Sequence, residues 1–105
     1  MITVGDGKYK VWLENKKIGK DILYMLGGGE QSHIGGVVLC EPNKEPKIIS
    51  LPGHYDTKVL KPIAQAACKK YNTRVVVTGG IHIDDATRVE IEKIVENCRE
   101  LEKCI

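Results

Sequence analysis

The sequence has no long apolar run. No stretch of its 105 residues approaches the roughly 20 consecutive apolar residues that a membrane-spanning helix needs. Residues 1–7 contain neither a charged segment followed by an apolar core nor the small-residue cleavage pattern of a secretion signal. We therefore expect a cytoplasmic protein that has no membrane partner.

A strong charge of one sign is also absent. Sixteen lysine and arginine residues stand against fourteen aspartate and glutamate residues, which gives a formal net charge of +2, and no basic block stands apart. Nucleic-acid-binding domains usually carry a pronounced basic surface, so nucleic acid is not an expected partner. An anionic ligand would have to be held by a local site.

The cysteines form no metal or redox motif. Cys40, Cys68, Cys98 and Cys104 are scattered without a Cys-x-x-Cys pair, which excludes a zinc ribbon and a thioredoxin-type site. In a reducing compartment we expect four free thiols, most of them buried as small apolar residues. Intracellular disulfides do occur in hyperthermophiles, and the many lysine, glutamate and isoleucine residues are compatible with such a source.

Hydrophobic periodicity predicts an α+β domain. Alternating or continuous apolar residues indicate strands at 8–14, 18–26, 37–40, 47–51 and 75–77, with a polar turn at 15–17 and a loose glycine-rich loop at 27–29. One helix precedes the last strand and a second helix follows it. The order β-β-β-β-α-β-α with short connections implies a mostly antiparallel sheet with helices packed on it.

The helices are predicted from apolar stripes and from their ends. The first should end at Asn72, and Pro62 should kink it or confine its regular part to later residues. Thr87 and Glu90 have the spacing of a capping box, so the second helix should begin there and run to about Lys103. Its apolar stripe consists of Ile91, Ile94, Val95, Cys98, Leu101 and Ile105.

Dimerisation is expected from the size of the chain and from one two-faced strand. Residues 1–105 make a single domain with a real core but too little buried surface to be generously stable alone. The strand at 18–26 has apolar residues on both faces, with Leu23 and Met25 on the second. That second face must be covered by a helix or by another subunit, and we predict a homodimer.

The three histidines are the main functional signal. Each lies in a glycine-containing loop at a strand end: His33 precedes Gly35 and Gly36, His54 follows Pro52 and Gly53, and His82 follows Gly79 and Gly80. A single such histidine is more often structural than functional, but the repeated context favours a shared site. We hypothesise that the histidines meet Asp56, Lys58 and Asp84 in a polar pocket with glycine backbone at its base.

At these residues the sequence resembles the LpdD-like family of prenylated flavin chaperones. The matching motifs are His33-Ile34-Gly35 entering an apolar strand, Pro52-Gly53-His54-x-Asp56 before a helix, and Gly80-Ile81-His82-Ile83-Asp84 before a second helix. They occur in the family's order between residues 11 and 101. In the second motif Tyr55 stands where the family often has lysine, and Lys58 lies close enough to replace that charge.

The resemblance implies a non-enzymatic protein with a carried ligand. Such a protein would bind reduced prenylated FMN and pass it to a UbiD-type aromatic-acid decarboxylase, on a homodimeric fold similar to small proteasome-assembly chaperones. Trp12 and Tyr24 could add aromatic contacts to the flavin. We predict no catalytic residue, and ligand contacts from His33, Gly35, Gly36, His54, Asp56, Lys58, Gly79, Gly80, His82 and Asp84.

Two alternatives remain open at this stage. His33, His54 and His82 could be three metal ligands of a hydrolase or lyase, with Asp56 or Asp84 behind them. That reading depends on tertiary convergence, because the histidines are not paired on one element. The other alternative is a protein-interaction module like the proteasome-assembly chaperones, which would leave the three histidine loops unexplained.

Overall fold

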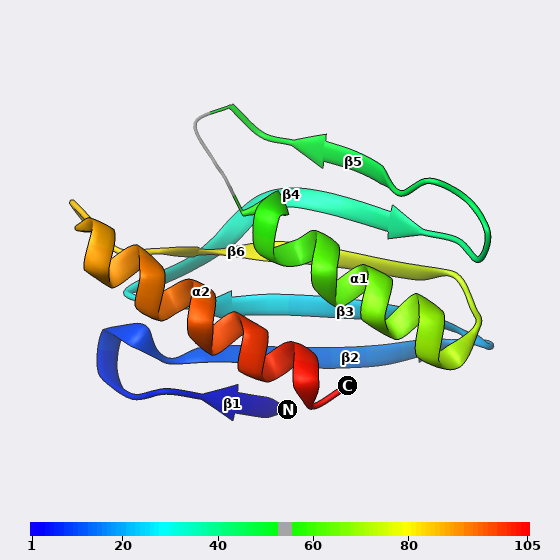
Figure 1. The fold of residues 1–105 in the computed structure, drawn as a ribbon, viewed down its shortest axis with the longest axis horizontal. Helices are drawn as coiled ribbons and strands as arrows, with labels where there is room; N and C mark the ends of the chain where they lie inside the picture. Colours follow the sequence, from blue (N-terminus) through cyan, green and yellow to red (C-terminus); the bar gives the residue numbers. More distant parts are fainter. Residues whose placement is uncertain (53–55) are drawn as a thin grey trace.

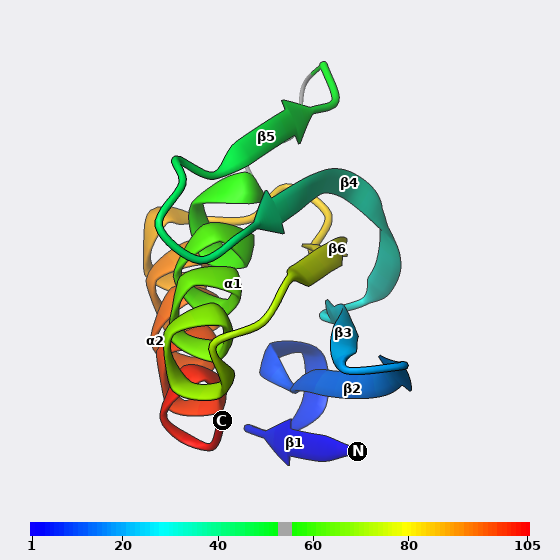
Figure 2. The same ribbon diagram turned by 90° about the vertical axis from the view of Figure 1, so that its right-hand side faces the viewer.

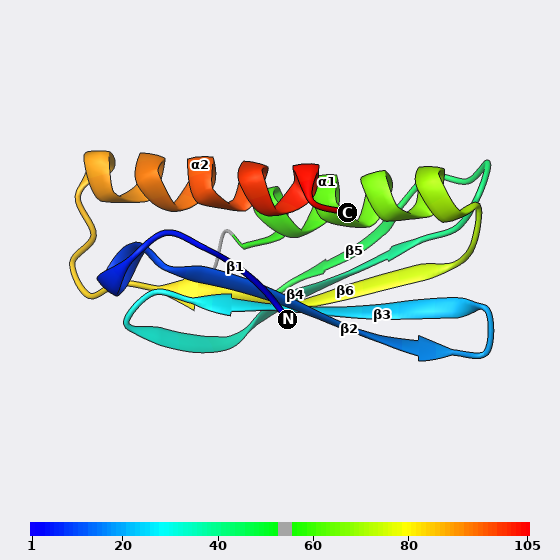
Figure 3. The same ribbon diagram turned by 90° about the horizontal axis from the view of Figure 1, so that it is seen from below.

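The strands form one six-stranded sheet in the computed structural model, which describes residues 1–52 and 56–105. Two helices lie on the same face of that sheet (Figures 1, 2 and 3). The strands are β1 (Ile2–Val4), β2 (Val11–Ile18), β3 (Asp21–Gly28), β4 (Gln31–Cys40), β5 (Lys47–Ser50) and β6 (Val75–His82). The helices are α1 (Thr57–Tyr71), α2 (Arg88–Lys103) and the 3-10 turn η1 (Gly7–Tyr9).

The sheet confirms the predicted α+β class. Its strand order is β1-β2-β3-β6-β4-β5, and every neighbouring pair is antiparallel except β3 and β6. The parallel pair arises because β6 follows α1 and enters the middle of the sheet (Figure 1). The helices therefore pack across strands that are distant in the sequence, and the far end of β6 reaches the start of α2.

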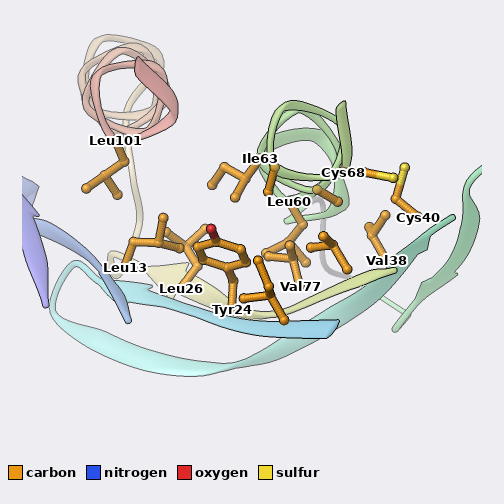
Figure 4. Packing of buried hydrophobic residues seen from close by; sticks show 14 of the residues in the cluster. Leu13, Tyr24, Leu26, Val38, Cys40, Leu60, Ile63, Cys68, Val77 and Leu101 are labelled. Atoms are coloured by element: carbon orange, nitrogen blue, oxygen red, sulfur yellow. The ribbon is translucent and has the colours of Figure 1, made fainter. Parts of the chain in front are cut away.

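The core lies between the helices and one face of the sheet. Alternation along β2, β3, β4 and β6 points one set of apolar side chains at the helices (Figure 4). Val11, Leu60, Val77 and Leu101 have no exposed surface. The rest of the cluster is Leu13, Ile22, Tyr24, Leu26, Val38, Cys40, Ile63, Ala64, Ala67, Cys68, Val75 and Cys98.

The opposite face of the sheet has no helix over it in the described part of the chain (Figure 3). Across the strands, Met25 pairs with Thr78, and Thr78 with Val37, while Leu23 pairs with Val76. These side chains are half-buried rather than buried. No helix of residues 1–52 or 56–105 therefore covers the second face of β3, which was predicted to need a cover.

Helix α1 confirms its predicted end and excludes one of the two effects predicted for Pro62. It ends at Asn72, whose left-handed φ of 49° stops the helix as expected. The helix is continuous from Thr57 to Tyr71, so its regular part is not confined to the residues after Pro62. Neither helix in the described residues is long and apolar enough to cross a bilayer.

Several strand boundaries differ from the predictions. The first predicted strand starts too early because residues 7–9 form the η1 turn, and β1 was not anticipated. Residues 15–17 are not a turn: β2 continues to Ile18, and the chain reverses at Gly19, whose φ is 62°. Residues 27 and 28 belong to β3, and β4 begins at Gln31 rather than at residue 37.

Candidate functional site

A pocket of about 500 Å³ opens where α1 begins, β6 ends and the first half of α2 passes over them. His33, Asp56 and His82 lie together in the lining and form its polar end, and most of the other lining residues are aliphatic. This split suits an amphiphilic ligand better than a purely ionic or purely apolar one. The lining residues are His33, Asp56, Lys58, Val59, Ile81, His82, Ile83, Ala86, Ile91, Ile94 and Val95.

Asp56 joins three elements at the polar end. Its Oδ1 accepts a hydrogen bond from the backbone N–H of Ile81 at 3.0 Å, and its Oδ2 lies 3.1 Å from Nε2 of His33. Its backbone carbonyl also accepts from the N–H groups of Val59 and Leu60 in the first turn of α1. The side chains of His33 and Asp56 are only 21% and 11% exposed. Asp56 therefore fixes β4, β6 and α1 relative to one another.

His82 forms a second, more exposed histidine–carboxylate pair. Its Nε2 lies 2.8 Å from Oδ1 of Asp84, and the two side chains are 47% and 81% exposed. The N–H of Asp84 donates to Oε1 of Glu30. The His82 ring meets the His33 ring edge to face with 6.1 Å between centroids. Two of the predicted histidines therefore come together, each with a carboxylate at one ring nitrogen.

The glycines were predicted to form the base of the pocket. In the structure they instead leave room for neighbouring groups of the protein. A Cβ on Gly35 would overlap the Asp56 carboxylate, and one on Gly80 would lie 2.8 Å from Nε2 of His33. The space beside these glycines is thus taken by the His33–Asp56 pair. Gly36 makes room for Thr57 of α1. Gly79 has a φ of 128° and lies against the carbonyl of Leu26, so it serves close strand packing.

The apolar wall was not predicted as part of the site. The stripe on α2 divides: Cys98 and Leu101 are buried in the core, whereas Ile91, Ile94 and Val95 line the pocket. The periodicity of the stripe was visible in the sequence, but the sequence did not show that its first half lines a pocket while its second half is buried in the core.

The aromatic residues considered for the flavin lie elsewhere. Tyr24 is 4% exposed in the core, where burial raises the pKa of its hydroxyl. The Trp12 ring covers Gly27, beside Ser32. Neither residue lines the pocket.

The remaining predicted residues divide as follows. Lys58 lines the pocket, as expected. His54 lies outside the described residues. Within residues 1–52 and 56–105, no three histidine, cysteine, aspartate or glutamate side chains gather as metal ligands.

The start of α2 is held by the capping box that the sequence predicted. Thr87 Oγ1 accepts from the N–H of Glu90, and Oε1 of Glu90 accepts from the N–H of Thr87. Glu90 also forms an ion pair with Lys8. The hydrogen bond from Lys8 and those within the box lower the pKa of Glu90 to about 2. These contacts anchor the part of α2 that overhangs the pocket.

Comparisons with known proteins agree on one family and one fold. The family model described as the prenylated flavin chaperone LpdD-like domain matches residues 5–105. Protein LpdD of Lactiplantibacillus plantarum is 27% identical over 94 residues, which span 85% of this chain and 69% of that protein. A crystal structure of a chaperone complex for yeast 20S proteasome assembly is similar with a TM-score of 0.57. It is 16% identical, and the match covers 98% of this chain and 92% of the other, so this likeness shows the fold.

Proposed function

The chain belongs to the LpdD-like family of prenylated flavin chaperones, and on that basis we propose that it carries reduced prenylated FMN to a UbiD-type decarboxylase. Membership of a chaperone family confirms the prediction of a non-enzymatic protein. The ligand, the recipient enzyme and a cytoplasmic site of action are parts of the proposal.

The observation that carries the proposal is the two-ended pocket. A flavin mononucleotide has an anionic phosphate, a largely apolar ring system and polar atoms along one ring edge. In the pocket, Lys58 supplies a cation, His33 and His82 supply polar ring nitrogens, and the α2 residues supply an aliphatic wall. A volume of about 500 Å³ is within the range of small-molecule and cofactor sites.

The residues around the pocket can bind and orient such a ligand without reacting with it. When bound, reduced prenylated FMN brings the electron-rich ring system that a decarboxylase uses. His33 is already paired with a carboxylate, and the aliphatic wall would exclude water from one side of a bound ligand. This arrangement suits storage and transfer rather than turnover.

An anaerobic titration of metal-stripped protein with reduced prenylated FMN tests the proposal. We expect saturable binding, which His82→Ala weakens by about 1 to 3 kcal/mol because a polar contact is lost. His54→Ala is expected to act in the same direction. Arg99→Ala is the matched control, since Arg99 lies on the solvent side of α2 in an i,i+3 pair with Glu96. Absence of binding, or an equal loss in the control, would contradict the proposal.

Elemental analysis of untreated protein distinguishes the metal alternative from the flavin proposal. A metal held by histidines should be near stoichiometric and should be lost below about pH 6, where free imidazoles become protonated. The hydrolase or lyase form of that alternative does not fit a chaperone family. Protein without metal that also ignores the reduced flavin would favour an interaction module.

We also propose that a second copy of the chain covers the open face of the sheet. Leu23, Met25, Val37, Val76 and the 63% exposed Ile49 lie on this face of four neighbouring strands, with Thr78 between Met25 and Val37. Apolar side chains gathered on an uncovered sheet face often mark a protein interface. A copy related by a two-fold axis would bring the same surface to it.

Light scattering at micromolar concentration tests the dimer. Wild-type protein should be dimeric, and Met25→Glu should shift it to a monomer because the charge would be buried in the interface. Ile91→Glu, which changes an exposed apolar residue on the helix side, should remain dimeric. A monomeric wild-type protein would contradict this part of the proposal.

A further inference from the structure

Two of the cysteines meet inside the protein. Cys40 is the last residue of β4 and Cys68 lies in the second half of α1. Their side chains point at one another, with the sulfur atoms side by side (Figure 4). Cys40 is 6% exposed and Cys68 is 5% exposed, and both are free thiols. Nothing in the flavin-binding proposal uses this pair.

The other two cysteines provide a contrast. Cys98 is 3% exposed, and burial raises the pKa of its thiol to about 12. Cys104 is exposed near the end of the chain. Burial and the neighbouring Cys40 thiol raise the pKa of Cys68 to about 11. The Cys68 thiol is therefore protonated at neutral pH and exchanges slowly with external disulfides, although its partner is adjacent.

We propose that Cys40 and Cys68 form a reversible disulfide that links β4 to α1. With a small-molecule disulfide as the oxidant, the Cys40 thiolate attacks one of its sulfur atoms and releases one small thiolate. The Cys68 thiolate then attacks the Cys40 sulfur of the mixed disulfide and releases the second. One small disulfide is thereby reduced to two small thiols, while two cysteine thiols lose their protons and are oxidised to one disulfide.

The position of the pair determines what the disulfide would stabilise. It would close the segment of residues 41–67, which carries β5 and the Asp56 and Lys58 side chains of the pocket. Closing a loop of this length restricts the unfolded chain and so favours the folded one. Because Cys40 and Cys68 already touch across the β4–α1 contact, the bond requires no large movement of the backbone.

The test incubates folded Cys104→Ser protein with oxidised glutathione and then blocks free thiols by alkylation. Trypsin places the two cysteines on different peptides, since Lys44 and Lys58 lie between them. We expect a Cys40–Cys68 linked peptide and, in a sample taken before alkylation, an intact mass that is lower by two hydrogen atoms. The thermal midpoint should rise by roughly 5 to 20 °C, and a reducing agent should reverse the rise.

Variants and a denatured sample keep the test decisive. Cys40→Ala and Cys68→Ala should each abolish the rise, while Cys98→Ala should retain it. Glutathione attached to either cysteine without a link between them would overturn the proposal. So would a linked peptide that forms only when the protein is oxidised in urea, because the pairing would then not come from the fold.

Discussion

The two helices carry similar apolar stripes but use them differently. In α1, Leu60, Ile63, Ala64, Ala67 and Cys68 are all buried against the sheet. In α2 only Cys98 and Leu101 are buried, and the first half of the stripe forms a wall of the pocket. Periodicity thus shows which face of a helix is apolar, while the covering partner depends on the path of the helix over the sheet.

The N-terminal ends of the two helices also differ in how deeply they are buried. Asp56 at the start of α1 is largely buried and connects to His33 and Ile81. The capping box at the start of α2 lies at the surface and is supported by Lys8. We conclude that α1 belongs to the stable core of the fold, whereas the first half of α2 is held by its cap and by contacts with Lys8 and Tyr9 and is available to a ligand.

The largest expected difference is between core truncations and pocket truncations. Leu60→Ala should lower the free energy of unfolding by about 2 to 5 kcal/mol, because a fully buried side chain is removed and a cavity remains. Ile91→Ala, at a side chain that is 53% exposed, should cost less than about 1 kcal/mol. Denaturant unfolding measures both. Equal losses in the free energy of unfolding would mean that Leu60 and Ile91 contribute equally to the core.

A smaller difference is expected between the two histidine–carboxylate pairs. Asp56→Ala should cost about 1 to 3 kcal/mol, because the Ile81 N–H and His33 lose their partner in a poorly exposed place. Asp84→Ala removes an 81% exposed side chain and should change stability by less than about 0.5 kcal/mol. The same unfolding measurement distinguishes them. An Asp56→Ala variant with an unchanged free energy of unfolding would show that the His33–Asp56 pair does not hold β4, β6 and α1 together.

The smallest effect concerns the cap of α2 and depends on pH. The pKa of Glu90 is lowered from 4.5 to about 2, so its contribution to stability is present above pH 4.5 and is lost as the pH falls toward about 2. Glu90→Gln should therefore lower the thermal midpoint at neutral pH, and the gap to wild type should close over that window. Glu92→Gln, in an exposed pair with Arg88, is the control and should show little pH dependence. A difference in thermal midpoint that persists as the pH falls from 4.5 toward about 2 would contradict the assigned role of Glu90.

Local chemistry explains what the sequence predicted correctly. Asn72 and the Thr87–Glu90 box mark helix ends through their own backbone bonds, so they could be recognised without tertiary information. The α+β class followed from the order of the elements. We hypothesised that the three histidines converge. The structure places His33 and His82 in the lining of one pocket, whereas His54 lies outside the described residues.

Tertiary contacts explain what the sequence did not predict. The short β1 owes its place to pairing with β2 and has little signal of its own. The glycines at 35 and 80 were interpreted as ligand contacts, but what lies beside them is decided by Asp56, a residue 21 and 24 positions away in the sequence. The pocket wall on α2 depends on how the helix lies relative to α1 and β6, and no pattern within α2 contains that information.

The central place of β6 has a consequence for synthesis and folding. β3 and β4 follow one another in the chain, yet β6 lies between them and pairs with both. A nascent chain that ends before Val75 therefore carries two unpaired strand edges at the middle of its sheet, with apolar side chains on both faces. Such edges invite pairing with other chains. The central pairing of the sheet cannot form until β6 has left the ribosome. The exposed edges of β3 and β4 therefore stay open to aggregation until late in synthesis.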